Sequence, residues 1–152
     1  MDKFFKIFHC KLYNREQILN WELPEKLKEK LGVDKHNYFF LTTSREDSHE
    51  GHEHIHLSIF PTRYNVINLL VVEVPIIDPK ILNKILKTII KFNFDIITST
   101  GFCKDQNECF LGIFFSKPLE NNTKDLVLEV EKIKNVGNVK VFNYTCDGYC
   151  EE

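Results

Sequence analysis

Two stretches in the second half of the chain are apolar at nearly every position. Val66–Val74 and Cys109–Phe115 carry apolar residues at odd and even positions alike, apart from Asn68 and Glu73 in the first stretch. Successive side chains of a strand point to opposite faces of a sheet. Continuous apolar runs of this length therefore predict two strands that are buried on both faces.

Two amphipathic stretches separate the predicted strands. Asp78 is suited to cap the first helix and Pro79 to occupy its first position, with the helix running to about Phe92. Apolar residues at spacings of one, three and four predict one buried stripe on it, made of Ile81, Leu82, Ile85, Leu86, Ile89 and Ile90. Asn122 or Thr123 should begin the second helix and Gly137 should stop it, with an inward face of Leu126, Val127, Val130 and Ile133.

The more polar stretches Phe94–Phe102 and Val139–Thr145 predict the remaining two strands. The order strand, helix, strand, strand, helix, strand is that of the ferredoxin-like βαββαβ sandwich, an α+β fold. In this fold the first and third strands lie inside the sheet, which agrees with their apolar character. Two helices cover one face only, so the N-terminal segment, a second copy of the chain or both should cover the other face.

Residues 1–63 predict a smaller βαββ segment that packs on the second domain, residues 64–152, or extends its sheet. The predicted helix is Pro24–Leu31, ending at Gly32, and the predicted strands are Phe4–Leu12, Tyr38–Thr43 and His54–Phe60. The order allows the segment to be a shortened version of the second half.

Composition narrows the class of protein. The chain has 152 residues, 43% hydrophobic and 28% charged, with a net charge of −2, so it should fold and nothing global recruits nucleic acid or a membrane. The N-terminus has no pattern of an export signal, so a cytoplasmic location and five reduced cysteines are expected. Cys103 and Cys109 should face each other across a turn, with Cys146 and Cys150 at the opposite end of the sheet.

The segment Val71–Leu82 resembles the first strand, loop and helix start of the ACT family, and Phe92–Ile97 resembles the passage from that helix into the second strand. The resemblance covers about residues 65–145. It implies a regulatory domain that binds an amino acid or a related metabolite between paired copies. Such a protein would be a homodimeric sensor or a regulatory subunit rather than an enzyme itself. Two alternatives stand beside it: a metal-binding or metal-sensing protein that uses His52, His54 and His56, and an interaction subunit of a larger enzyme.

Carried over by position, the resemblance implies ligand contacts at one loop. The residues are Asp78, Pro79, Lys80 and Ile81, with Asp95 supplied by a neighbouring copy. Lys80 stands where the family commonly has glycine, so a long cationic side chain replaces an open approach to the backbone. The alternative interpretation is that Asp78 and Pro79 simply begin a helix.

The strongest chemical pattern is a histidine-rich strand. His52, His54 and His56 alternate with other residues, so in an extended strand all three imidazoles point to one face. Neighbouring members lie about 6.6 Å apart, so one pair and a third ligand could hold a transition metal such as zinc or nickel. The alternative is a solvated, titratable strand face. No phosphate-binding glycine loop, nucleophile elbow or His-Glu-x-x-His pair accompanies it.

Overall fold

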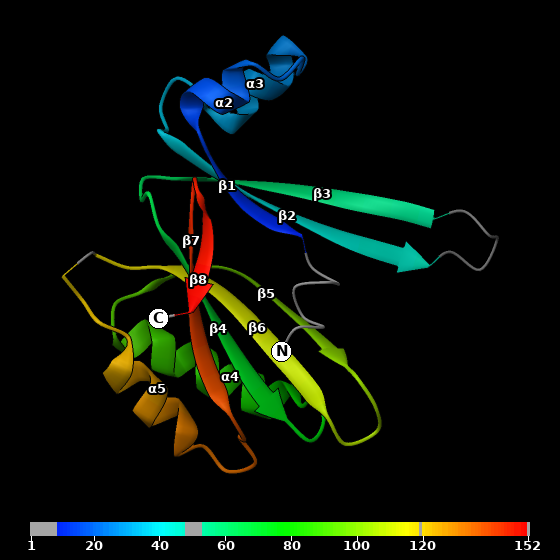
Figure 1. The fold of residues 1–152 in the computed structure, drawn as a ribbon, viewed down its shortest axis with the longest axis vertical. Helices are drawn as coiled ribbons and strands as arrows, with labels where there is room; N and C mark the ends of the chain where they lie inside the picture. Colours follow the sequence, from blue (N-terminus) through cyan, green and yellow to red (C-terminus); the bar gives the residue numbers. More distant parts are fainter. Residues whose placement is uncertain (1–8, 48–52, 119, 152) are drawn as a thin grey trace. The chain divides into compact units, whose positions relative to one another are not determined.

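The computed structural model describes residues 9–47, 53–118 and 120–151, which form an α+β protein with two antiparallel sheets (Figure 1). The chain divides into two compact units, Met1–Asn65 with Thr145–Gly148 and Val66–Tyr144 with Tyr149–Glu152. Among the described helices, none has the length and apolar character needed to cross a membrane.

The first unit has a three-stranded sheet and two short helices. The strands lie in the order β1-β2-β3, with bounds Cys10–Asn14, Tyr38–Asp47 and Glu53–Thr62. Helix α3, Glu25–Leu31, ends at Gly32 in the left-handed conformation (φ 62°), as the sequence predicts. Helix α2, Arg15–Leu19, was not predicted. Residues 4–8 of the predicted first strand lie outside the described residues.

Strand pairing distinguishes the two units. In the first unit β1 pairs directly with β2, the next strand along the chain after helices α2 and α3. In the second unit the first strand pairs with the third and the fourth but not with the second. The first unit is therefore not a shortened version of the second, and its strands form a sheet of their own instead of extending the other.

The second sheet has the strand order β5-β6-β4-β7-β8. Its strands are β4 Ile67–Val74, β5 Asp95–Cys103, β6 Cys109–Ser116, β7 Val139–Thr145 and β8 Gly148–Glu151. The prediction that the two apolar strands are neighbours inside the sheet is confirmed, because β4 and β6 pair over seven positions. The prediction that β7 is an edge strand is wrong at its carboxyl half, because β8, which was not predicted, pairs with it there.

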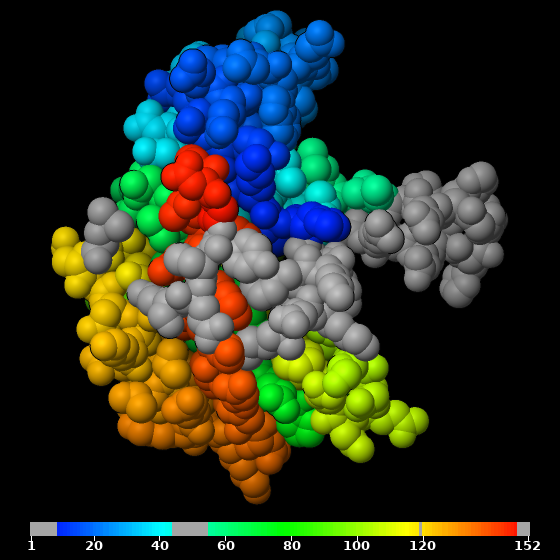
Figure 2. All heavy atoms as spheres, in the orientation of Figure 1, coloured from blue at the N-terminus to red at the C-terminus, as the bar shows by residue number. Residues whose placement is uncertain are grey.

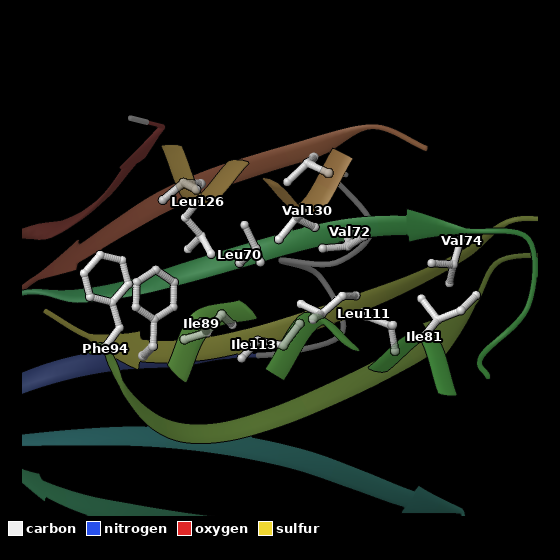
Figure 3. Packing of buried hydrophobic residues seen from close by; sticks show 14 of the residues in the cluster. Leu70, Val72, Val74, Ile81, Ile89, Phe94, Leu111, Ile113, Leu126 and Val130 are labelled. Carbon is white, nitrogen blue, oxygen red and sulfur yellow. The ribbon is translucent and has the colours of Figure 1, made fainter. Parts of the chain in front are cut away.

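Helices α4, Pro79–Lys91, and α5, Lys124–Glu131, cover one face of this sheet (Figure 1). The core between them contains alternate residues of β4 and β6 and the inward residues of both helices (Figure 3). Phe94 and Phe115 stack at one end of it, with ring centroids 5.4 Å apart. Two details of the prediction fail: Ile90 is exposed on α4, and α5 ends at Glu131, well before Gly137.

The opposite face of the sheet is also buried within the single chain. Ile67, Leu69 and Val71 of β4 are fully buried, and Phe114 of β6 is nearly so. Asn68, on the helix side of β4, is tolerated in the core because its Nδ2 donates a hydrogen bond to Oδ1 of Asn143 on the paired strand.

Candidate functional site

The loop between β4 and α4, together with the first turn of α4, holds four of the five predicted ligand residues. The Asp78 carboxylate accepts a hydrogen bond of 2.8 Å from the backbone N–H of Lys80, and Pro79 occupies the first helical position. This is an N-terminal helix cap, in which a carboxylate accepts a hydrogen bond from a backbone N–H that has no acceptor within the helix. Lys80 is exposed, whereas Ile81 is buried in the core and directs its side chain away from the loop surface.

Two apolar side chains are exposed on the loop that precedes α4. Ile76 is 63% exposed, and Ile77 reaches over β5 at Gly101. A Cβ added at Gly101 would come 3.1 Å from Cδ1 of Ile77 and 3.2 Å from the carbonyl oxygen of Phe110. The glycine therefore lets the loop lie close against the strand. Lys80, three residues after Ile77, is exposed as well.

Asp95, the fifth predicted residue, lies at the other end of the sheet. It opens β5 opposite Ser116, and β6 pairs there with the start of β4, whereas the Asp78 loop follows the end of β4. One chain does not bring Asp95 to the loop. A shared site would need the Asp95 of a neighbouring copy, which is the form in which the resemblance implies it.

The β5–β6 hairpin joins the same end of the sheet as the Asp78 loop. Cys103 and Cys109 are direct cross-strand partners, as predicted, with Cα atoms 3.9 Å apart. The expectation that both are reduced thiols is wrong in this structure, where their proximity gives a disulfide. Sγ of Cys109 lies 3.8 Å from the carbonyl oxygen of Pro75, so the bond borders the loop.

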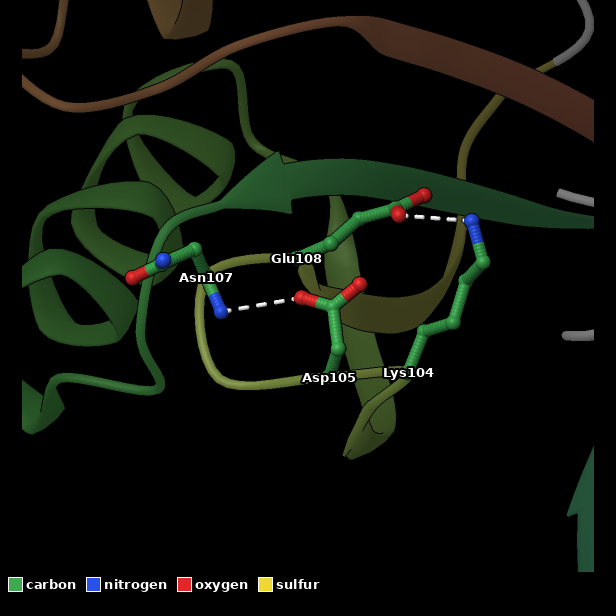
Figure 4. Close-up of polar contacts among 4 residues, drawn as sticks. All are labelled: Lys104, Asp105, Asn107 and Glu108. Atoms are coloured by element: carbon green, nitrogen blue, oxygen red, sulfur yellow. Dashed lines mark hydrogen bonds and ion pairs between the residues drawn. The ribbon is translucent and has the colours of Figure 1, made fainter.

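The tip of this hairpin is polar and internally bonded (Figure 4). Nζ of Lys104 donates to Oε2 of Glu108 at 2.6 Å, and Oδ1 of Asp105 accepts from the N–H of Asn107 at 3.0 Å. The hydrogen bond to Glu108, followed by the attraction of that carboxylate, raises the pKa of Lys104. Because the ammonium is exposed, the pair is an ordinary surface ion pair that shapes the turn.

The histidine strand is described only in part. His52 lies outside the described residues, His54 is on β3 opposite Glu46, and His56 is exposed on β3 opposite Ser44. Among the residues that the structure describes, no three His, Cys, Asp or Glu side chains are grouped closely enough to hold a metal ion. The alternating backbone of β3 places positions 54 and 56 on one face, as expected, with Ile55 and Leu57 on the other.

Cys146 follows β7 at the end of the sheet opposite the disulfide, since Tyr144 pairs with Ile67 at the start of β4. The predicted separation of the two cysteine pairs along the sheet therefore holds for this residue. Burial, reinforced by the neighbouring Asp147 carboxylate, raises the pKa of the Cys146 thiol. A raised pKa keeps the thiol protonated and makes it a poor nucleophile.

Sequence reasoning missed an apolar groove between α5 and β7. Its cavity volume is about 530 Å³, and its wall on α5 contains Val127 and the 55%-exposed Leu128. Val139 and Val141 form the side on β7. Figure 2 shows α5 and the first part of β7, both in orange shades, next to each other on the surface. The groove is completed by Asn122, Thr123, Lys124, Glu131 and Lys140.

A sequence signal for this groove exists. Lys124, Val127, Leu128 and Glu131 are spaced by three, four and seven residues, so they share one face of α5. That face adjoins the buried one: Leu126 and Val130 are buried, Val127 packs against the core and is partly buried, and Leu128 is exposed. An exposed leucine on a second face of a short helix indicates a surface that the domain core does not use.

No known family model matches the chain, and no curated protein matches it.

Proposed function

We propose that the second unit is a ferredoxin-like, ACT-type regulatory module that binds an amino acid or a related metabolite and is not itself an enzyme. The observation that carries the proposal is the strand order β5-β6-β4-β7 with α4 and α5 on one face. In such a sheet the loop after the first central strand meets the start of the first helix. Here Ile76 and Ile77 of the loop and Lys80 of the first turn of α4 are exposed.

The chemistry of the loop favours a small zwitterionic or acidic ligand. The Lys80 ammonium supplies a positive charge for a ligand carboxylate, and the isoleucine pair supplies apolar contact for a side chain. Asp78 is committed to the backbone N–H of Lys80, so its contribution is to fix the loop. Ile81 contributes backbone only, because its side chain belongs to the core.

The module acts as a homodimer in this proposal. Asp95 lies at the far end of the sheet from its own Asp78 loop, so the five residues form one site only if two copies pack with their sheets in opposite directions. An Asp95 carboxylate from the second copy would then meet the ligand ammonium. The partner regulated by the dimer is an enzyme or another regulator.

A cytoplasmic location belongs to the same proposal. Disulfides are rare in that compartment. The state of Cys103 and Cys109 in protein alkylated directly in cell lysate tests the location, and a fully oxidised pair in cells would contradict it.

The experiment is a thermal-shift screen of the common amino acids and their metabolic relatives, combined with the solution mass. A ligand at about one hundred times its Kd should stabilise the chain by about 2.7 kcal/mol. For a chain of this size the Tm should rise by about 5–10 °C. Lys80→Ala should abolish the shift, whereas Lys87→Ala, an exposed lysine further along α4, should retain it. A monomer that no compound stabilises contradicts the proposal.

A further inference from the structure

The two sulfur atoms of the Cys103–Cys109 disulfide lie in different environments. Cys103 is exposed at the end of β5, whereas Cys109 is only 1% exposed at the start of β6. A disulfide is opened by a thiolate that attacks one of its sulfurs, and access decides which sulfur is attacked. An external thiolate can reach Cys103 but not Cys109. Disulfides with an exposed sulfur are also the ones that tend to be labile and regulatory.

The buried side of the bond touches the loop that precedes α4. Sγ of Cys109 lies 3.8 Å from the carbonyl oxygen of Pro75. In the disulfide this sulfur has no hydrogen to donate, whereas a Cys109 thiol would be a weak donor that faces this oxygen. Gly101, which shares a face of β5 with Cys103, lies against Ile77 of the same loop. The loop therefore contacts the hairpin at two residues, one of them beside the bond.

Contacts other than the disulfide hold this hairpin together. The N–H of Lys104 donates to the carbonyl oxygen of Glu108 at 2.8 Å, and the two side chains form an ion pair. Phe102 and Phe110, the next cross-strand pair, stack with ring centroids 5.4 Å apart. Opening the bond should therefore leave the strands paired and confine the change to the two sulfurs and the residues that touch them.

We propose that Cys103 and Cys109 form a reversible thiol–disulfide switch, which a dithiol reductant opens at Cys103 and whose state alters the loop of residues 75–78. A thiolate of the reductant bonds to Sγ of Cys103, and the bond to Cys109 breaks. The Cys109 sulfur leaves with the electron pair and takes up a proton. The second thiolate of the reductant then attacks the first sulfur of the reductant, which releases Cys103 to take up a proton and leaves the reductant as a disulfide. Exchange with an oxidised dithiol runs the same steps in reverse.

The two states of the switch differ at the loop. Two unbonded sulfurs need more room than a bonded pair, and Cys109 is enclosed by the core, so Cys103 moves outward and the Cys109 thiol donates to the Pro75 carbonyl. Asp78 and Lys80 follow closely in the chain, so the switch would change the affinity of the ligand site. That consequence rests on the proposed function, whereas the switch itself does not. In the cytoplasm proposed above, disulfides are usually transient and redox-sensing.

The first test compares amide resonances of the isotope-labelled full chain with the bond closed and after reduction by dithiothreitol. The Ile77 amide should shift and should return when oxidised dithiothreitol is added, while cross-strand contacts between Phe102 and Phe110 persist. The control is the Cys103→Ser/Cys109→Ser double variant, in which dithiothreitol should leave the loop resonances unchanged because the bond is absent. The measurement uses no ligand, so its outcome is independent of whether the loop binds a metabolite.

Alkylation of the reduced full chain gives the second readout. Trypsin cleaves after Lys104, so the two cysteines fall in separate peptides. Cys103 should react with iodoacetamide at least about tenfold faster than Cys109, because only Cys103 is exposed. Loop resonances that ignore reduction, the same response in the double variant, or equal alkylation rates would each overturn the inference. A bond that excess dithiothreitol leaves closed, or a hairpin that separates on reduction, would overturn it in favour of a structural cross-link.

Discussion

Replacing two isoleucines of the same helix by alanine should lower the stability by very different amounts. Ile85 is 0% exposed in the core beneath α4, whereas Ile90, five residues later, is 59% exposed. The change removes three carbon atoms, worth about 2.4 kcal/mol when fully buried at about 0.8 kcal/mol each. The cavity left at a tightly packed site raises the expected loss for Ile85→Ala to about 2–5 kcal/mol.

At Ile90 less than half of the side chain is buried, so the lost burial is about 1 kcal/mol. The higher helix propensity of alanine offsets a few tenths of that. Thermal unfolding followed by circular dichroism at 222 nm measures both variants. Ile85→Ala should lower the Tm by about 5–15 °C, and Ile90→Ala by about 3 °C or less. Equal losses in the two variants would refute the assigned orientation of α4 on the sheet.

Three further predictions concern the Asp78 helix cap, the Cys103–Cys109 disulfide and the Cys146 thiol. Asp78→Ala should lower the free energy of unfolding in urea by about 1 kcal/mol, because the helix cap is lost. Asp78→Ser should keep most of that stability, since serine can also cap a helix. Equal stability of wild type and Asp78→Ala would contradict the capping bond. Reduction of the Cys103–Cys109 disulfide, which closes a loop of sequence separation 6, should lower the unfolding free energy by about 2 kcal/mol, and an unchanged value in dithiothreitol argues against the bond. Alkylation of Cys146 by iodoacetamide, followed by mass spectrometry, should reach half its maximal rate at a higher pH than a cysteine in a short peptide, because burial keeps the thiol protonated; a midpoint at lower pH contradicts that environment.

The inner strands were predictable from the sequence because many residues of each strand carry the same apolar pattern. Val66–Val74 and Cys109–Phe115 are apolar at odd and even positions alike, a pattern typical of a strand that is covered on two faces, and both runs are short enough for strands. Helix α4 was predictable for a related reason, since its stripe, cap and N-terminal proline all indicate the same boundaries. The error at Ile90 shows the limit: periodicity defines a broad apolar arc but not where the neighbouring sheet ends.

Short elements carried too little pattern. Helix α2 has five residues, of which only Ile18 is buried, so no period could be recognised. Strand β8 has four residues after a tight turn and lacks apolar alternation. The groove beside α5 was missed for a different reason: it depends on how α5 packs beside β7, which only the tertiary structure shows. The prediction of ligand residues at the Asp78 loop came from a resemblance. Only the register of the sheet shows that Asp95 lies at the other end from this loop.

The most direct test is the strand order of the second sheet, because the place of the Asp78 loop and its separation from Asp95 both depend on it. Cross-strand nuclear Overhauser effects in the isotope-labelled full chain report this order. The structure predicts contacts from the backbone of Leu70 to Ile113 on one side and to Val141 on the other. Contacts that instead join β4 to β5 as neighbours, or that leave one side of β4 without a partner strand, would contradict the account.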